Sequence, residues 1–119
     1  MALTFYPLRM QIAPSEYKAK LISLLKNHEK FNWNTIPFTT VSKDDPIFQV
    51  TVGEYQGNSN WNGNVWTLIN EIVVWGLLDY GEKELVAELA VKTIYAFNKK
   101  YAEFLNPLDY SGYGFLKYA

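Results

Sequence analysis

The sequence predicts a mainly α-helical fold, organised as one domain over residues 1–119, with a long irregular segment in its middle. Two stretches carry this prediction. The apolar run 61–80 has the length of a helix and almost no polar face. The next stretch, 83–104, repeats apolar residues at helical spacing with charged residues between them. Residues 31–60 show no comparable period, and they separate these helices from a first one near the N-terminus.

The first helix is expected over residues 15–27. Pro14 suits the first turn of a helix. One amphipathic stripe follows it, formed by Tyr17, Leu21, Leu24, Leu25 and His28. We expect His28 to be half-buried near the C-terminal end of the helix, where the helix dipole favours a histidine.

The middle segment contains two prolines and the pair Asp44–Asp45 just before Pro46. Paired carboxylates can form an acid pair or a metal site, but no further carboxylate or histidine lies close in sequence. A turn before Pro46 is therefore the preferred interpretation. Ile47 to Tyr55 alternates weakly between apolar and polar residues, which is compatible with one strand.

The second helix is expected over residues 63–80. Because apolar side chains cover nearly its whole circumference, it is buried on every side or spans a membrane. A membrane span needs about 20 apolar residues, and Asn70 and Glu71 interrupt the run too early. The sequence therefore predicts a central helix walled in by others, with Trp75 and Leu78 inside.

The third helix is expected over residues 83–104 and is plainly two-faced. Gly81 can adopt the left-handed conformation that ends the preceding helix. A fully buried helix, a tight glycine turn and an amphipathic helix form an inner–outer pair, the unit of helical solenoids and closed helical barrels. No internal repeat of fixed period is visible, which counts against a helical-repeat interaction protein.

The composition excludes several classes of function. The net charge of −1, with no basic run, makes nucleic acid an unsuitable partner. Without cysteine and with a single histidine, neither a metal site nor a nucleophile–histidine pair is expected, so carboxylates remain as acid–base groups. We expect no cofactor. No signal peptide or membrane span is visible, so the cytoplasm is the expected location.

Five motifs in a fixed order resemble one known family. They are Pro-Leu with Ile-Ala-Pro, then Asp-Asp-Pro, Trp-x-Gly-x-Val-Trp-x-x-Ile-Asn, Gly-Leu-x-x-Tyr-Gly, and Glu-Phe-Leu-Asn-Pro with Ser-Gly-x-Gly. The order is similar to the C-terminal third of the (α/α)6-barrel glycoside hydrolases of family 63 and their mannosylglycerate-hydrolase and trehalase relatives. The resemblance implies a partial (α/α) barrel. Asn64 departs from the family, which usually has proline there.

The resemblance implies a sugar pocket at the start of the central helix. Gly63 would let the chain turn closely into the helix, while Trp66 and Asn70, four residues apart, share one face of it. The residues expected to bind a glucoside or mannoside are Trp61, Gly63, Trp66, Asn70, Asn106 and Tyr113. The alternative is that both tryptophans belong to the core and that Asn70 ties down a neighbouring loop.

The resemblance also implies inverting hydrolysis by two carboxylic acids, with Glu103 as the general base. The general acid should be an aspartate in a Gly/Asp/Ser-Pro-Arg segment far upstream, which this sequence lacks. Two hypotheses follow. The chain is either a split or truncated glycosidase subunit, inactive alone, or a non-catalytic helical module that still binds sugar.

An open barrel fragment leaves apolar surface uncovered, and a soluble monomer rarely exposes large apolar patches. We therefore expect either a homo-oligomer or a complementary chain that completes the barrel. Trp75, Tyr95 and Phe97 are the candidate interface residues.

Overall fold

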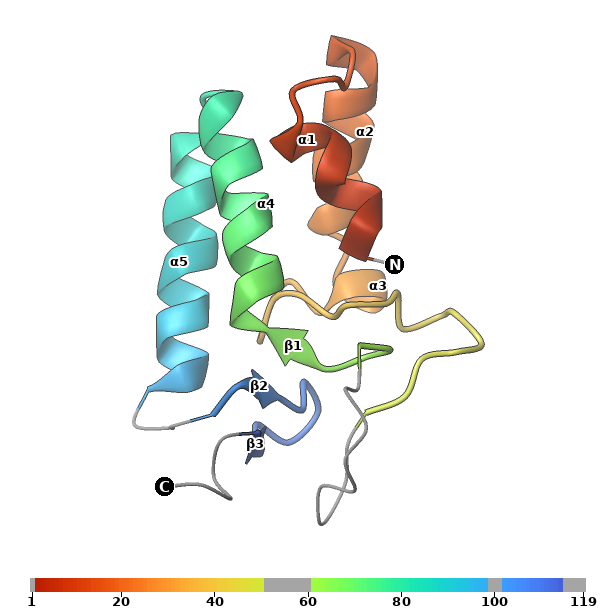
Figure 1. Ribbon diagram of the computed structural model, residues 1–119, viewed down its shortest axis with the longest axis vertical. Helices are drawn as coiled ribbons and strands as arrows, with labels where there is room; N and C mark the ends of the chain where they lie inside the picture. The colour runs from red at the N-terminus through yellow and green to blue at the C-terminus, as the bar shows by residue number, and fades with distance from the viewer. Residues whose placement is uncertain (1, 51–60, 99–101, 115–119) are drawn as a thin grey trace.

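The computed structural model describes residues 2–50, 61–98 and 102–114 (Figure 1). Helices come first, then a two-helix hairpin whose ends join a small sheet. The elements are η1 (Ala2–Phe5), α1 (Tyr6–Arg9), α2 (Ser15–Leu25), α3 (His28–Phe31), β1 (Val65–Trp66), α4 (Thr67–Asp79), α5 (Lys83–Phe97), β2 (Phe104–Leu105) and β3 (Gly112–Tyr113). The mainly helical fold is as predicted.

The core lies where the N-terminal helices meet the α4–α5 hairpin. Phe5 and Leu8 are fully buried and belong to the same cluster as Val73 and Leu77 of α4. A side chain at Gly76 would come within 2.8 Å of the Arg9 amide nitrogen. The small residue therefore permits the close approach of α1 to α4 that is seen in Figure 1.

The predicted helix 15–27 is confirmed from Ser15 to Leu25, and His28 proves to start a new helix, α3. Asn27 separates the two because its side chain accepts a hydrogen bond from the Lys30 amide, which is an N-cap. His28 is half-buried, as expected, but its Nδ1 accepts a hydrogen bond from the Asn34 amide at 3.2 Å and so braces the following loop.

The central helix is shorter and less buried than predicted. It begins at Thr67, after strand β1, and ends before Gly81, whose φ of +78° is the left-handed conformation expected there. The expectation that Trp75 and Leu78 lie inside is wrong, since they are 50% and 37% exposed. The reason is a lack of neighbours: in the described part of the chain, α4 packs mainly on α1 and α5, and Trp75 and Leu78 remain exposed.

The predicted helix 83–104 ends at Phe97, and Phe104 lies in a strand instead. The three-stranded antiparallel sheet has the order β1–β2–β3, with Trp66 opposite Phe104 and Phe104 opposite Tyr113. It lies at the open end of the hairpin (Figure 1). One face of this sheet adjoins the main core, and the other packs on a second cluster of Ile36, Val65, Ala96 and Leu105.

The middle segment is irregular, as predicted. Asp45 forms the expected turn before Pro46: its amide bonds to the Ser42 carbonyl and its carboxylate accepts from the Ile47 amide. Residues 47–50 form no strand, and 51–55 of that predicted strand lie outside the described residues.

Neither a membrane-spanning helix nor a metal cluster is found in the described ranges. Among these residues, none of the helices has both the length and the apolar character needed to cross a bilayer. In the same part of the chain, no three or more His, Cys, Asp or Glu side chains gather into a group that could hold a metal ion.

Candidate functional site

A stack of four aromatic rings crosses the small sheet and ends at the surface. The ring centroids of Trp61 and Trp66 are 4.9 Å apart, those of Trp66 and Phe104 4.6 Å, and those of Phe104 and Tyr113 5.8 Å. The planes deviate from parallel by only 19–25°. The register explains the stacking of Trp66, Phe104 and Tyr113, because residues directly opposite in neighbouring strands place their side chains on the same face. Trp61 lies in the turn before β1 and adds the fourth ring.

The outermost ring of the stack belongs to Trp61, which is 44% exposed, whereas Trp66 is only 7% exposed. A half-exposed indole backed by a buried one is a rigid apolar plate at the surface. Trp61, Trp66 and Tyr113, three of the residues predicted to bind sugar, are thus brought together. Phe104, which joins them, was missed by the sequence analysis. Its position opposite both aromatic residues could be recognised only once the strand register was known.

Two polar atoms beside the plate lack partners within the described residues. The Trp66 indole N–H is buried and donates to nothing there, and the Asn62 side-chain carbonyl is buried and accepts nothing. Buried polar groups are nearly always paired, so each exception calls for an explanation. Asn62 was not among the site residues predicted from the sequence. The two atoms supply one donor, in β1, and one acceptor, in the turn that carries Trp61.

Gly63 holds this loop against the middle segment. A Cβ at this position would lie 2.8 Å from the carbonyl carbon of Gln49, so no other residue fits without a backbone shift. The Gly63 amide donates to the Thr40 hydroxyl at 3.0 Å, and the Gln49 amide donates to the Asn62 carbonyl at 2.8 Å. The close approach expected of Gly63 is therefore made to Gln49, ahead of β1, and not into the helix.

Asn70 is buried, and its amide is engaged by the protein itself. Its Nδ2 donates to the Pro37 carbonyl at 2.7 Å and to the Thr93 hydroxyl at 3.1 Å, while its Oδ1 accepts from the Phe38 amide at 3.5 Å. These bonds match the alternative considered for Asn70, that it ties down a neighbouring loop. The groove that reaches Asn70 is not lined by Trp61, Trp66 or Glu103. Sugar binding by Asn70 beside the two tryptophans stays a prediction.

Glu103 is half-buried immediately before β2 and is not a member of the stack. Its amide donates to the Tyr113 carbonyl at 2.8 Å. A Cβ at Gly114, whose φ is +106°, would lie 2.8 Å from the Glu103 carboxylate oxygen Oε2. The Glu103 carboxylate therefore lies against the backbone of Gly114. Any side chain at position 114 would collide with Glu103, and the positive φ also favours glycine there.

Asn106 is buried at the turn that leads from β2 to β3. Its Oδ1 accepts from the Leu108 amide at 2.8 Å, and its backbone bonds to Ser111 and Tyr110. An asparagine that folds back on its own backbone stabilises a turn. The described contacts of Asn106 thus stabilise the turn between β2 and β3. Beyond this turn, the Tyr113 hydroxyl accepts a hydrogen bond from the Ser111 hydroxyl at 3.0 Å.

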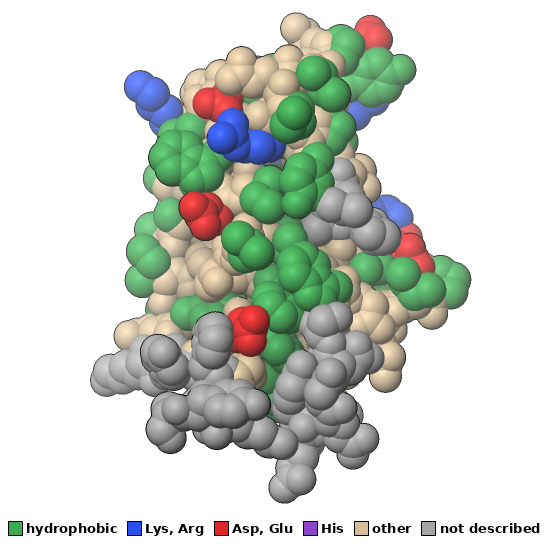
Figure 2. Space-filling view, in the orientation of Figure 1, with side chains coloured by type: hydrophobic (Ala, Val, Ile, Leu, Met, Phe, Trp, Pro, Cys, Tyr) green, Lys and Arg blue, Asp and Glu red, His purple; other side chains and the backbone are tan. Residues whose placement is uncertain are grey.

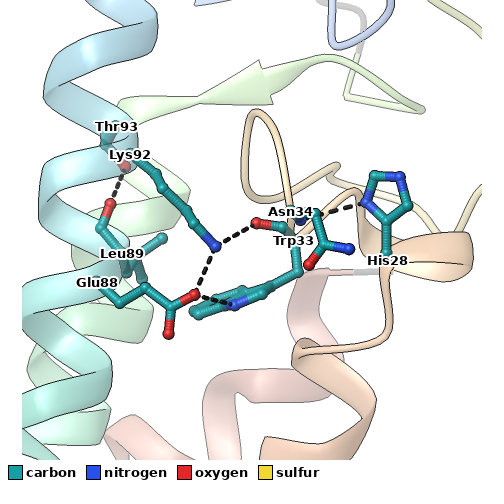
Figure 3. Close-up of polar contacts among 7 residues, drawn as sticks. All are labelled: His28, Trp33, Asn34, Glu88, Leu89, Lys92 and Thr93. Atoms are coloured by element: carbon teal, nitrogen blue, oxygen red, sulfur yellow. Dashed lines mark hydrogen bonds and ion pairs between the residues drawn. The ribbon is translucent and has the colours of Figure 1, made fainter.

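A second polar cluster joins α5 to the loop after α3 (Figure 3). The Trp33 indole N–H donates to Glu88 at 2.7 Å, and the Lys92 ammonium donates to the Trp33 carbonyl at 2.8 Å, pairs with Glu88 and lies 4.9 Å from the Trp33 ring centroid. The Lys92 ammonium, helped by the Trp33 N–H, holds the pKa of the Glu88 carboxyl below its usual range. Because Trp33 is only 2% exposed, the cluster has a structural role: it fastens α5 to the loop after α3.

Residues 2–118 match the family model described as the mannosylglycerate hydrolase MGH1-like glycoside hydrolase domain. The chain belongs to this family of glycoside hydrolases. The family resemblance inferred from the motifs is confirmed, and so is the partial helical barrel. No curated protein sequence matches this member of the family.

Solved structures agree with the family match. A mannosylglycerate hydrolase of family 63 from Thermus thermophilus, in complex with glucose, has a TM-score of 0.74 and 26% identity over 92% of this chain. The same enzyme in complex with Tris and D-glycerate gives 0.66 and 27%. This glycoside hydrolase domain spans only 26% and 25% of those chains, about a quarter of each.

Proposed function

We propose that this chain is one part of an inverting glycoside hydrolase that acts on glucosides or mannosides. In this proposal Trp61 and Trp66 form an apolar plate for one sugar ring, and Glu103 is the general base. The observation that carries the proposal is the aromatic stack that ends at the half-exposed Trp61. Support for the sugar comes from the related Thermus thermophilus enzyme, whose structure holds glucose.

Each residue of the proposed site would contribute in a distinct way. The Trp61 ring would cover the apolar face of the sugar, while the Trp66 N–H and the Asn62 side-chain carbonyl, both buried, would reach hydroxyl groups only after the turn that carries Trp61 moves. The Glu103 carboxylate would accept a proton from the water that attacks the anomeric carbon. In an inverting reaction a second carboxylic acid protonates the leaving oxygen from the other side. The aspartate motif that supplies this acid in the family is absent from the sequence.

We therefore expect no turnover of aryl glucosides or mannosides by the purified chain. A polypeptide that brings the missing acid would be needed for activity. The contrary result would be decisive: turnover that Glu103→Gln abolishes would mean that an acid within these 119 residues had been missed.

The second candidate function is sugar binding without catalysis. It is favoured by the two unpaired polar atoms beside Trp61, which need nothing from Glu103. Glu103→Gln separates the two candidates only in the presence of an acid-supplying chain, because it should leave binding unchanged and remove catalysis.

The sugar plate itself is tested by titration with glucose and mannose, followed by tryptophan fluorescence. We expect a Kd on the order of 1 mM, a free energy of about −4 kcal/mol. Trp61→Ala should weaken binding by about 2- to 13-fold, since an aromatic contact contributes roughly 0.5–1.5 kcal/mol. Trp75→Ala is the matched control, because Trp75 is also half exposed but lies in α4. An equal loss of sugar affinity in both variants would refute the role of Trp61 in binding the sugar.

A further inference from the structure

A shallow apolar groove runs between α4 and α5. Its volume is about 270 Å³, and its lining comes from both helices: Thr67, Asn70, Glu71, Val74, Ala90, Thr93 and Ile94. Small-molecule sites usually measure roughly 300–1,000 Å³ and enclose most of their ligand. This groove is smaller and open, so it suits an inserted side chain better than a free ligand.

Exposed apolar side chains surround the groove on both helices. Leu68 and Trp75 lie three and four residues from Glu71, Leu78 lies four after Val74, and Val91 lies three before Ile94, so each is one helical turn from a groove residue. We call Leu68, Trp75, Leu78, Val91 and Ile94 the α4–α5 face; these residues are 37–71% exposed. In Figure 2, hydrophobic side chains gather over the region of α4.

The three interface residues expected from the sequence lie in different places in the structure. Trp75 belongs to the α4–α5 face. Tyr95 is 76% exposed, but it does not line the groove and no groove residue lies three or four positions from it, so it falls outside the α4–α5 face. Phe97 is partly buried against the cluster of Ile36, Val65, Ala96 and Leu105, so it faces the interior.

The area of this face matches what a dimer requires. Its five side chains, 37–71% exposed, present apolar surface on the order of 500 Å², within the range of about 300–600 Å² of a large and often functional surface patch. A standard interface buries about 800 Å² per partner, of which roughly 60–65% is apolar. The requirement is therefore also on the order of 500 Å².

We propose that a second copy of this chain docks on the α4–α5 face. A two-fold dimer brings the same patch of both subunits together, so the patch must be self-complementary. This face meets that condition because it carries both a groove and exposed apolar side chains beside it, Trp75 and Val91. In the dimer, an apolar side chain of one copy fills the groove of the other.

Sedimentation velocity between about 1 and 100 μM, a range that brackets a micromolar Kd, tests the proposal. The wild-type chain should sediment as a dimer, and Ile94→Lys should raise the dissociation constant at least about tenfold. Ile12→Lys is the matched control, because Ile12 is also 71% exposed and lies outside the face. It should leave the dimer intact.

A second readout uses the absence of cysteine from the sequence. Cysteine introduced by Ile94→Cys should be alkylated more slowly as the protein concentration rises, whereas Ile12→Cys should react at a constant rate. A wild-type chain that stays monomeric throughout would overturn the proposal and leave the face to the helices of a larger barrel. A dimer in which the two lysine variants, or the two cysteines, behave alike would overturn it as well.

Discussion

Asn70 shows how a single buried side chain can serve the fold where a ligand contact was expected. Its amide reaches the loop at Pro37 and Phe38 and the next helix at Thr93, so one residue of α4 holds two other segments. A loop that packs inside a domain needs such partners for its backbone groups. Asn70 therefore affects the candidate site indirectly, because its hydrogen bonds fix the position of α4.

We predict that Asn70→Ala lowers the free energy of unfolding by about 2–4 kcal/mol, because it leaves the Pro37 carbonyl and the Phe38 amide buried and unpaired. Urea denaturation measures this change. The exposed Asn34, in the same region of the chain, is the control, and Asn34→Ala should stay within about 0.5 kcal/mol of wild type. Equal losses of unfolding free energy in the two variants would show that the hydrogen bonds of Asn70 do not stabilise the fold.

Glu88 is the residue for which the structure predicts a pH effect. Its pKa is lowered in the folded chain, chiefly by Lys92. A carboxyl with a lowered pKa contributes stability above its unfolded pKa of about 4.3, and this stability is lost as the pH falls through the folded value. Because the side chain is 40% exposed, the contribution is modest.

Glu88→Gln should therefore reduce the fall in the urea midpoint between pH 7 and acid pH below about 4. Glu84→Gln, an exposed position on the same helix, should retain the wild-type fall. The expectation fails if the two variants lose stability in parallel as the pH is lowered.

At the scale of elements, the small sheet depends on the aromatic stack more than on its few hydrogen bonds, since each strand has only two residues. A two-stranded or very short sheet is marginal in water without a packed face. Phe104 supplies the middle of that face, with 1% of its surface exposed. The position of Trp61 at the surface thus depends on a ring two places along the stack.

We predict that Phe104→Leu costs about 1–3 kcal/mol of unfolding free energy and weakens the near-ultraviolet circular dichroism of the stacked tryptophans. Phe97→Leu, a partly buried phenylalanine outside the stack, should reduce stability less and leave that signal unchanged. Loss of the signal in both variants would argue against a special role for the stack.

The sequence predicted these elements to different degrees. The helices α2, α4 and α5 were predicted because each shows a clear apolar period or run over three turns or more. The sheet was missed because a two-residue strand has no readable alternation, and its pairs join residues far apart in the chain. The exposure of Trp75 was missed because apolar content reports what a helix could bury, not which neighbours are present.

The candidate site was predicted in a similar way. The resemblance selected Trp61, Trp66 and Tyr113, which do meet in one stack. It could not select Phe104 or Asn62, because their part depends on the strand register and on which buried atoms remain unpaired. The role of Glu103 as a base stays a prediction.

At the scale of the whole molecule, the chain covers about a quarter of the length of a related mannosylglycerate hydrolase, and its α4–α5 face is exposed. If two copies share this face, folding and association are linked, and the midpoint of thermal unfolding rises with protein concentration. We expect such a rise for the wild-type chain and for Ile12→Lys. Ile94→Lys should show a constant midpoint, and differential scanning calorimetry at several concentrations checks this.

The order of elements around the hairpin has a consequence for folding kinetics. Strand β1 ends where α4 begins, and β2 follows α5, so the strands are about 40 residues apart in the chain and meet only when the two helices have folded back on each other. Local helix formation is fast, whereas closing such a distant contact comes later. The stacking of Trp66 on Phe104 should thus appear after the helical signal during refolding. The surface proposed for a sugar would be the last part of the molecule to become native.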